Sequence, residues 1–112
     1  MKKIAVSSQG QSLDDMLDPR FGRCPNFVIA EIDNGKILND KSIPNSSAGK
    51  GGGAGISAAQ LMGNEKVEVV ITGNVGPNAY QVLSTLGIEM YSGAGKVRDS
   101  IEDYIQGKLK RL

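Results

Sequence analysis

One short stretch of the sequence, DPRFGRCPNF, collects the side chains best suited to chemistry. It spans residues 18–27 and holds Arg20, Arg23 and Cys24 between two prolines, with Gly22 allowing a tight turn. Two guanidinium groups can hold an anion through charge-assisted hydrogen bonds worth about 1.5–3 kcal/mol each. They would also lower the pKa of a nearby thiol and favour the thiolate, which is the form that binds metals. The stretch therefore indicates an anion or metal site.

Both features also have a purely structural interpretation. Cys24 can be a small buried hydrophobic residue, and the arginines can pair with the carboxylates of Asp14, Asp15 and Asp18. The sequence leaves these alternatives open. Cys24 is the only cysteine, so no internal disulfide can form and we expect a cytoplasmic location. The absence of histidine excludes acid–base catalysis by histidine and removes the commonest metal ligand.

A run of five glycines between Gly49 and Gly55 is the second candidate for a binding loop. It does not fit the phosphate-binding pattern G-x-x-x-x-G-K-[ST], because Lys50 is followed by glycine. Residues 53–58 fit the dinucleotide pattern G-x-G-x-x-[GA], although a polar loop precedes them in place of a strand. The alternative is a surface loop leading into a helix that packs closely on the sheet.

The elements that must position these loops follow from the hydrophobic pattern. Helices are predicted from about residue 56 to 63, from Pro77 to a cap at Gly87, and from Val97 toward Leu109. The order β-β-β-α-β-α-β-α favours a mixed sheet with helices on its faces. Asn34-Gly35 predicts a tight hairpin turn, and the polar strand after it is expected at a sheet edge. Strands are predicted over residues 4–8, 26–33, 36–43, 67–72 and 88–92.

Three of these strands are expected to end at one edge of the sheet. If the first, fourth and fifth strands run parallel, the segments that follow them meet where ligands of open α/β sheets usually bind. Two of the three segments also open helices, whose N–H groups and dipoles of about +0.5 charge favour an anion. The segments are Ser7–Gly10, Gly73–Pro77 and Ser92–Lys96.

Composition limits the partners. The chain has 112 residues, which fits one domain over residues 1–112. Its net charge of +1 gives no general reason to expect nucleic acid or a membrane as partner. No apolar run approaches the ~18 residues of a membrane span, and the N-terminus is typical of a first strand more than of a signal peptide.

The residues leave several other function classes in competition. A ribonuclease-type nuclease needs carboxylates at strand ends to hold two Mg²⁺ ions; Ser7, Ser8 and Thr72 stand there, so we do not expect a nuclease. A nucleotide or small-molecule protein could use the anion-favouring edge with Lys50 and Lys96, but no nucleophile–base pair is visible. A protein–protein adaptor could add a partner strand at the polar edge strand.

Three motifs together resemble the dinitrogenase iron–molybdenum cofactor biosynthesis family, of the NifX/NifY type and the C-terminal part of some NifB proteins. They are RFGRCPNF, the GGGAG cluster before a small-residue helix, and VVITGNVGPNAYQVLSTLGIEMY, and the similarity runs from Lys3 to about Gly107. The resemblance implies a ribonuclease H-like α/β fold with a five-stranded mixed sheet of order 3-2-1-4-5. It implies a carrier or store, not an enzyme, for an iron–sulfur cluster or iron–molybdenum cofactor precursor. Metallocluster donor and acceptor proteins would be its partners, and the chain would be a monomer or weak homodimer.

The same resemblance assigns cofactor-binding residues, with Cys24 as the metal ligand. A cluster is a bulky, sulfur-rich anion, which arginines, backbone N–H groups and a thiolate suit chemically. One cysteine cannot supply the four thiolates of an ordinary iron–sulfur cluster. Either the cluster arrives complete and is held mainly by charge, or two chains pair their Cys24 residues. The assigned residues are Arg20, Gly22, Arg23 and Cys24; Gly52, Gly53 and Gly55; and Asn74, Gly76, Pro77 and Asn78.

Overall fold

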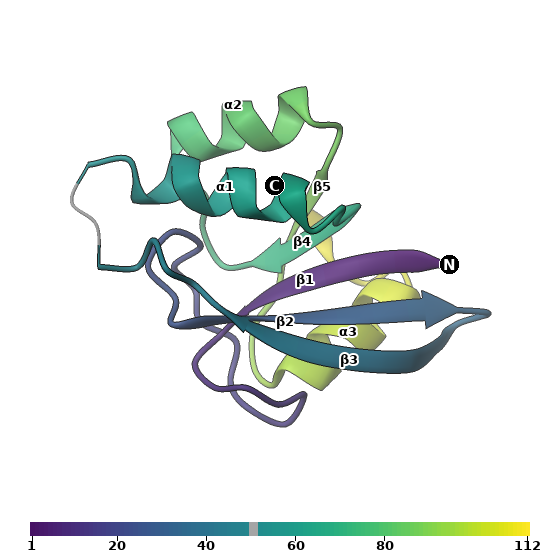
Figure 1. Ribbon diagram of the computed structural model, residues 1–112. Coiled ribbons are helices and arrows are strands. Elements are labelled where there is room, and N and C mark those ends of the chain that lie inside the picture. The colour runs from purple at the N-terminus through teal and green to yellow at the C-terminus, as the bar shows by residue number, and fades with distance from the viewer. Residues whose placement is uncertain (50–51) are drawn as a thin grey trace.

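A mixed sheet with helices on both faces forms the protein (Figure 1). The computed structural model describes residues 1–49 and 52–112. The helices are α1 (Ala54–Asn64), α2 (Pro77–Thr85) and α3 (Val97–Ile105). The strands are β1 (Lys2–Ser8), β2 (Asn26–Asp33), β3 (Lys36–Pro44), β4 (Val69–Thr72), β5 (Glu89–Ser92) and β6 (Lys110–Arg111).

The sheet has the order β3-β2-β1-β4-β5-β6. β1 pairs antiparallel with β2 and parallel with β4, and β4 pairs parallel with β5. The predicted order 3-2-1-4-5 is therefore confirmed, but the prediction of five strands is wrong. The sixth strand, β6, pairs antiparallel with β5 through Tyr91↔Arg111 and Ser92↔Lys110. It has two exposed basic residues and no hydrophobic alternation, so the sequence pattern gave no sign of it. The ribonuclease H-like classification stays a prediction.

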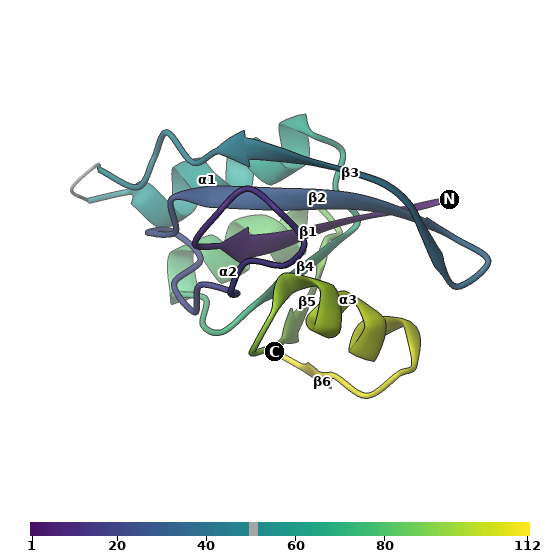
Figure 2. The same cartoon turned by 90° about the horizontal axis from the view of Figure 1, so that it is seen from below.

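Two hydrophobic clusters fill the space between the sheet and its helices. Figure 2 shows α3 on the face of the sheet opposite α1 and α2. Successive side chains of β1 point to opposite faces of the sheet. Ala5 packs on the face covered by α1 and α2, while Ile4 and Val6 pack on the face covered by α3. Small residues on α1, among them the fully buried Ala58 and Ala59, let that helix pack closely on the sheet. Among the described residues, no helix is both long and apolar enough to cross a bilayer.

Turn chemistry fixes two of the connections. The hairpin between β2 and β3 turns at Asn34 and Gly35, with φ angles of 52° and 74°, as the sequence predicts. Pro77 occupies the first turn of α2, also as predicted. The last helix ends at Ile105, earlier than expected, because Gly107 adopts a left-handed φ of 72°.

The exposed strand β3 lies at the sheet edge, as predicted. Its register shifts, with Glu31 opposite Asn39 and Ile32 opposite Ile37, so Leu38 is an extra, bulged residue. A bulge and charged side chains are features by which natural edge strands resist pairing with other chains. β3 is therefore poorly suited to accept a partner strand, which weakens the adaptor interpretation.

Candidate functional site

A pocket of about 200 Å³ lies where the N-termini of α1 and α2 meet, beyond the end of β4. We call it the helix-end pocket. Its walls come from three separate stretches: the loop after β1, the entry to α1 and the entry to α2. The lining residues are Phe21, Gly22, Gly53, Gly55, Ile56, Gly76, Pro77, Asn78 and Ala79.

The helix-end pocket brings together residues from all three sequence motifs. Gly22 comes from the first motif, Gly53 and Gly55 from the second, and Gly76, Pro77 and Asn78 from the third. β1, β4 and β5 run parallel, as predicted, so the loops that follow these strands begin at the same edge of the sheet. Of the three segments that the sequence places at this edge, Gly73–Pro77 contributes Gly76 and Pro77 to the pocket, whereas Ser7–Gly10 and Ser92–Lys96 do not line it.

Close backbone contact explains glycine at two of these positions. A Cβ atom added to Gly22 would lie 3.0 Å from the backbone N and Cα of Gly55. A Cβ added to Gly55 would lie 3.2 Å from the Cβ of Ala79. The loop after β1 therefore lies against the backbone of α1, and α1 lies against the Ala79 methyl group of α2.

Both helix ends that face the pocket have uncapped N–H groups. The N-cap residues Gly53 and Gly76 make no side-chain cap hydrogen bond, and the first turns of α1 and α2 contain no acidic residue. The first intrahelical bonds are donated by Ser57 and Tyr80, so the N–H groups just before them have no acceptor within their helices. By contrast, the first turn of α3 carries Asp99. Two such ends at one pocket favour a bound anion.

The walls of the helix-end pocket carry no charged side chain among the described residues. Phe21, Ile56, Pro77 and Ala79 give an apolar lining, and Asn78 adds a carboxamide. Such a surface suits a large, weakly hydrated anion better than a small, strongly hydrated one, because a strongly hydrated anion loses more on leaving water.

Arg20 lies outside the walls of the helix-end pocket and pairs with Asp18. Its Nε and Nη2 atoms donate to the two carboxylate oxygens at 3.0 and 2.8 Å, and its backbone N–H donates to the same carboxylate at 2.9 Å. The Asp18 side chain is 1 % exposed, whereas that of Arg20 is 64 % exposed. Arg20 thus pairs with a nearby carboxylate, as the purely structural interpretation predicts. The pair fixes the backbone directly before Phe21 and Gly22.

Replacing Asp18 with asparagine is expected to destabilise the protein by about 1 kcal/mol at neutral pH, because the buried carboxylate loses its charge-assisted bonds to the exposed Arg20. Hydrogen bonds from Arg20 hold the pKa of Asp18 below its usual range. This contribution is therefore complete above the unfolded-state pKa of about 3.9 and is lost as pH falls through the lower folded-state pKa. Urea unfolding between pH 7 and pH 2 should show the two proteins converging in acid. A constant difference across this range would contradict the assignment.

Cys24 is buried, as the structural alternative for this residue predicts. Its side chain is fully inaccessible, and the thiol donates to the carbonyl of Phe21 at 3.3 Å. Burial raises the pKa of the thiol to about 12, and the negative charge of Asp18 acts in the same direction. The predicted lowering of this pKa is therefore wrong, because burial and Asp18 outweigh the hydrogen bonds from Asn45 and the backbone that favour the thiolate.

The Cys24 thiol is expected to react slowly with a thiol reagent such as Ellman's reagent in the native protein. At pH 8 the native rate should be lower than the rate in guanidinium chloride by about tenfold or more, since burial blocks access and suppresses the thiolate. A native rate equal to the unfolded rate would show an accessible thiolate and restore the metal-ligand interpretation.

Asn45 ties the loop after β1 to the start of the glycine run. Its buried side chain donates to the carbonyls of Cys24 and Gly22 at 2.9 and 3.3 Å, and its Oδ1 accepts the N–H of Ser47 at 3.1 Å. Arg23 makes a second tie by donating to the carbonyl of Ala48 at 3.2 Å. The sequence analysis missed Asn45; an asparagine that ends a strand before a glycine run was the available signal.

The other predicted residues surround the helix-end pocket. Asn74 is exposed, and its carbonyl accepts the N–H of Phe21 at 3.4 Å, which joins the loop before α2 to the loop after β1. Gly52 is exposed in the turn before α1. Lys50 and Gly51 lie outside the described residues.

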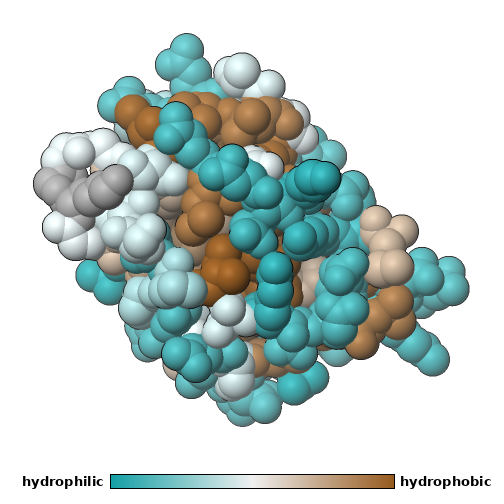
Figure 3. Space-filling view, in the orientation of Figure 1, coloured by the Kyte–Doolittle hydropathy of each residue, from teal (hydrophilic) through white to brown (hydrophobic). Residues whose placement is uncertain are grey.

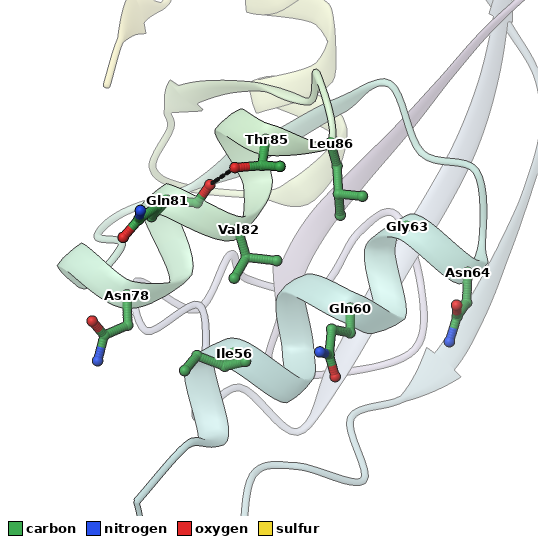
Figure 4. Close-up of a pocket in the computed structure, with 9 residues that line it drawn as sticks. All are labelled: Ile56, Gln60, Gly63, Asn64, Asn78, Gln81, Val82, Thr85 and Leu86. Atoms are coloured by element: carbon green, nitrogen blue, oxygen red, sulfur yellow. Dashed lines mark hydrogen bonds between the residues drawn. The ribbon is translucent and has the colours of Figure 1, made fainter.

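A groove between α1 and α2 was also missed by the sequence analysis (Figure 4). It has a volume of about 620 Å³, and it shares Ile56 and Asn78 with the helix-end pocket. Val82 and Leu86 add aliphatic surface, in the region where Figure 3 shows hydrophobic surface gathered over these helices. Val82 and Leu86 recur at helical spacing along α2, a pattern that by itself does not distinguish a buried helix face from the wall of a groove.

The described residues contain no cluster of three or more His, Cys, Asp or Glu side chains that could hold a metal ion. Fold and site together define a small α/β protein with an anion-favouring pocket between two helix ends. The family model "Dinitrogenase iron-molybdenum cofactor" matches residues 1–107, and the chain belongs to this family.

Individual relatives agree with this membership. An uncharacterized protein of Methanocaldococcus jannaschii, MJ0580, is 37 % identical over 100 residues, covering 88 % of this chain and 85 % of its own. The apo form of the orange protein from Desulfovibrio gigas superposes with a TM-score of 0.92 at 33 % identity, covering 100 % of this chain and 93 % of the other. The Thermotoga protein TM1290 of the DUF35 family has a TM-score of 0.83 at 30 % identity, covering 100 % and 94 %.

Proposed function

We propose that this protein is a carrier or temporary store for an iron–sulfur cluster or an iron–molybdenum cofactor precursor. The cargo binds in the helix-end pocket, and the protein performs no chemistry on it. Family membership supports a role in cofactor handling. The relative from Desulfovibrio gigas was solved as an apo form, which supports a bound group in that protein. Cytoplasmic donor and acceptor proteins deliver and collect the cargo.

The observation that carries the proposal is the pair of uncapped helix N-termini at one glycine-walled pocket. Glycine at positions 53, 55 and 76 keeps side chains away from the backbone N–H groups. A bulky ligand can therefore approach those groups directly. The fixed dipoles of α1 and α2 supply the favourable potential, so no charged wall is needed.

In this proposal the cluster arrives complete and keeps its own sulfur ligands. Cys24 is buried with a raised thiol pKa, so pairing of two Cys24 residues between chains is disfavoured. Sulfide and thiolate sulfur atoms accept hydrogen bonds from backbone N–H groups, and such bonds also tune cluster potentials. Arg20 supports the site indirectly, because Asp18 compensates its charge and the pair holds the backbone just before Phe21.

Anaerobic reconstitution tests the proposal. The protein is mixed with iron and sulfide, or with a cluster preassembled on small thiols, and then gel-filtered. We expect retained iron and sulfide with visible charge-transfer absorption, and Cys24→Ala should retain as much as the wild type. Excess phosphate or ATP should displace little of the cargo. The absence of retained iron from either source would contradict the proposal, and loss confined to Cys24→Ala would contradict its non-covalent mode.

A further inference from the structure

A second cavity, of about 510 Å³, lies at the opposite end of β1 from the helix-end pocket. The two sites share no residue. The second cavity is bounded by Lys2 at the start of β1, by the β2–β3 turn and by the end of α3, elements that can be followed in Figure 2. Nothing in the proposed carrier role uses this end of the molecule.

Two tyrosines form an aromatic wall of this cavity. The rings of Tyr91 and Tyr104 meet edge to face, with centroids 5.1 Å apart. The Tyr91 hydroxyl donates to the Glu89 carboxylate at 3.2 Å, which fixes that ring. Ile105 and Leu109 provide neighbouring aliphatic surface. A flat aromatic ring would find both stacking and apolar contact here.

Lys2 places a positive charge at the same cavity. Its ammonium group donates to the Tyr104 hydroxyl at 3.3 Å and lies 6.0 Å from the centre of that ring. Among the described residues it forms no ion pair, and the nearby carboxylates of Glu68 and Glu89 act on it only at longer range. A ligand carboxylate could therefore pair with Lys2 without displacing a protein carboxylate.

Two glycines leave the cavity unfilled. Gly35 and Gly107 both have left-handed φ angles, of 74° and 72°, which side chains rarely adopt. Even a Cβ at Gly107 would find no atom within 4 Å. Backbone geometry thus keeps open a space bordered by aromatic, aliphatic and cationic groups, which is the usual composition of small-molecule sites.

We propose that this second cavity binds a small aromatic carboxylate. The ring packs against Tyr91 and Tyr104, and the carboxylate pairs with Lys2. This inference does not depend on the proposed carrier function, since the two sites share no residue.

Titration with 2-naphthoate, followed through backbone amide signals by NMR, tests this inference. We expect saturable shifts centred on residues 2, 91 and 104, with about tenfold weaker binding in Lys2→Gln because a charge-assisted bond is lost. Lys3→Gln is the matched control, since the next residue of β1 points to the other face of the sheet, and it should bind as the wild type does. The uncharged 2-naphthamide should bind about tenfold more weakly than 2-naphthoate.

Three results would overturn the inference. They are the absence of saturable shifts at millimolar 2-naphthoate, equal binding of the acid and the amide, and equal binding by Lys2→Gln and the wild type. Unchanged dispersion of the amide spectrum in Lys2→Gln establishes that the variant is folded.

Discussion

Replacing Gly76 with tryptophan is expected to abolish cargo binding while leaving the fold intact. Gly76 has φ −67° and ψ 163°, an extended conformation that any residue adopts. Gly76 lines the helix-end pocket and a Cβ there would meet no atom within 4 Å, so the indole has open space and is expected to block the pocket without displacing the protein. Retained iron should fall by about tenfold or more. The free energy of unfolding should change by about 1 kcal/mol or less, since no side-chain cap is lost.

The matched control for Gly76→Trp is Lys96→Trp. Lys96 is the N-cap residue of α3, with a similar φ of −73° and ψ of 148°, but it does not line the helix-end pocket. It adds the same indole at an equivalent helix position on the other face of the sheet. Equal cargo retention by the two variants would place the cargo elsewhere.

Replacing Gly73 with alanine is expected to disrupt both stability and binding, although it adds one methyl group. A Cβ on Gly73 would lie 2.6 Å from the Cβ and 2.7 Å from the Cα of Pro19, closer than such atoms can approach. The loop after β1 must therefore move away from the loop before α2, which breaks the contact between the Phe21 N–H and the Asn74 carbonyl. We expect a loss of about 1–3 kcal/mol in urea unfolding, together with reduced cargo retention.

Gly76→Ala provides the comparison for this second variant. It adds the same methyl group three residues later, where nothing lies within 4 Å. Its stability should stay within about 0.5 kcal/mol of the wild type. Equal stabilities for the Gly73 and Gly76 alanine variants would show that the contact with Pro19 is not tight.

Local patterns were enough to predict most of the fold. Asn34-Gly35 requires a hairpin turn, Pro77 suits the first turn of a helix, and the apolar run of β4 requires cover on both faces. From these follow the parallel strands and their shared edge, and hence the meeting of Gly22, Gly55 and Gly76 at one pocket. The sheet edge at which the pocket lies was therefore predictable because it depends on topology, while the binding role of these residues stays a prediction.

Other features depend on contacts between residues far apart in sequence and could not be predicted. The burial of Cys24 results from packing beneath the loop after β1, together with Asn45, which lies 21 residues away. β6 forms because Lys110 and Arg111 pair with the exposed edge of β5. The groove between α1 and α2 depends on the spacing of two helices, which Gly63 sets through its close contact with Leu86. In each case the deciding contact joins segments that are about 20 residues apart in the sequence.

The most direct test of the central claim is to locate a sulfur-rich metal anion on the protein. Tetrathiomolybdate is diamagnetic, so its addition under anaerobic conditions can be followed through backbone amide signals. We predict that the largest shifts occur at Gly55, Ile56, Asn78 and Ala79, the residues whose N–H groups lie at the uncapped ends of α1 and α2, and that phosphate produces much smaller ones. Shifts centred on Cys24 with little change at the helix ends, or no saturable shifts at all, would contradict binding in the helix-end pocket.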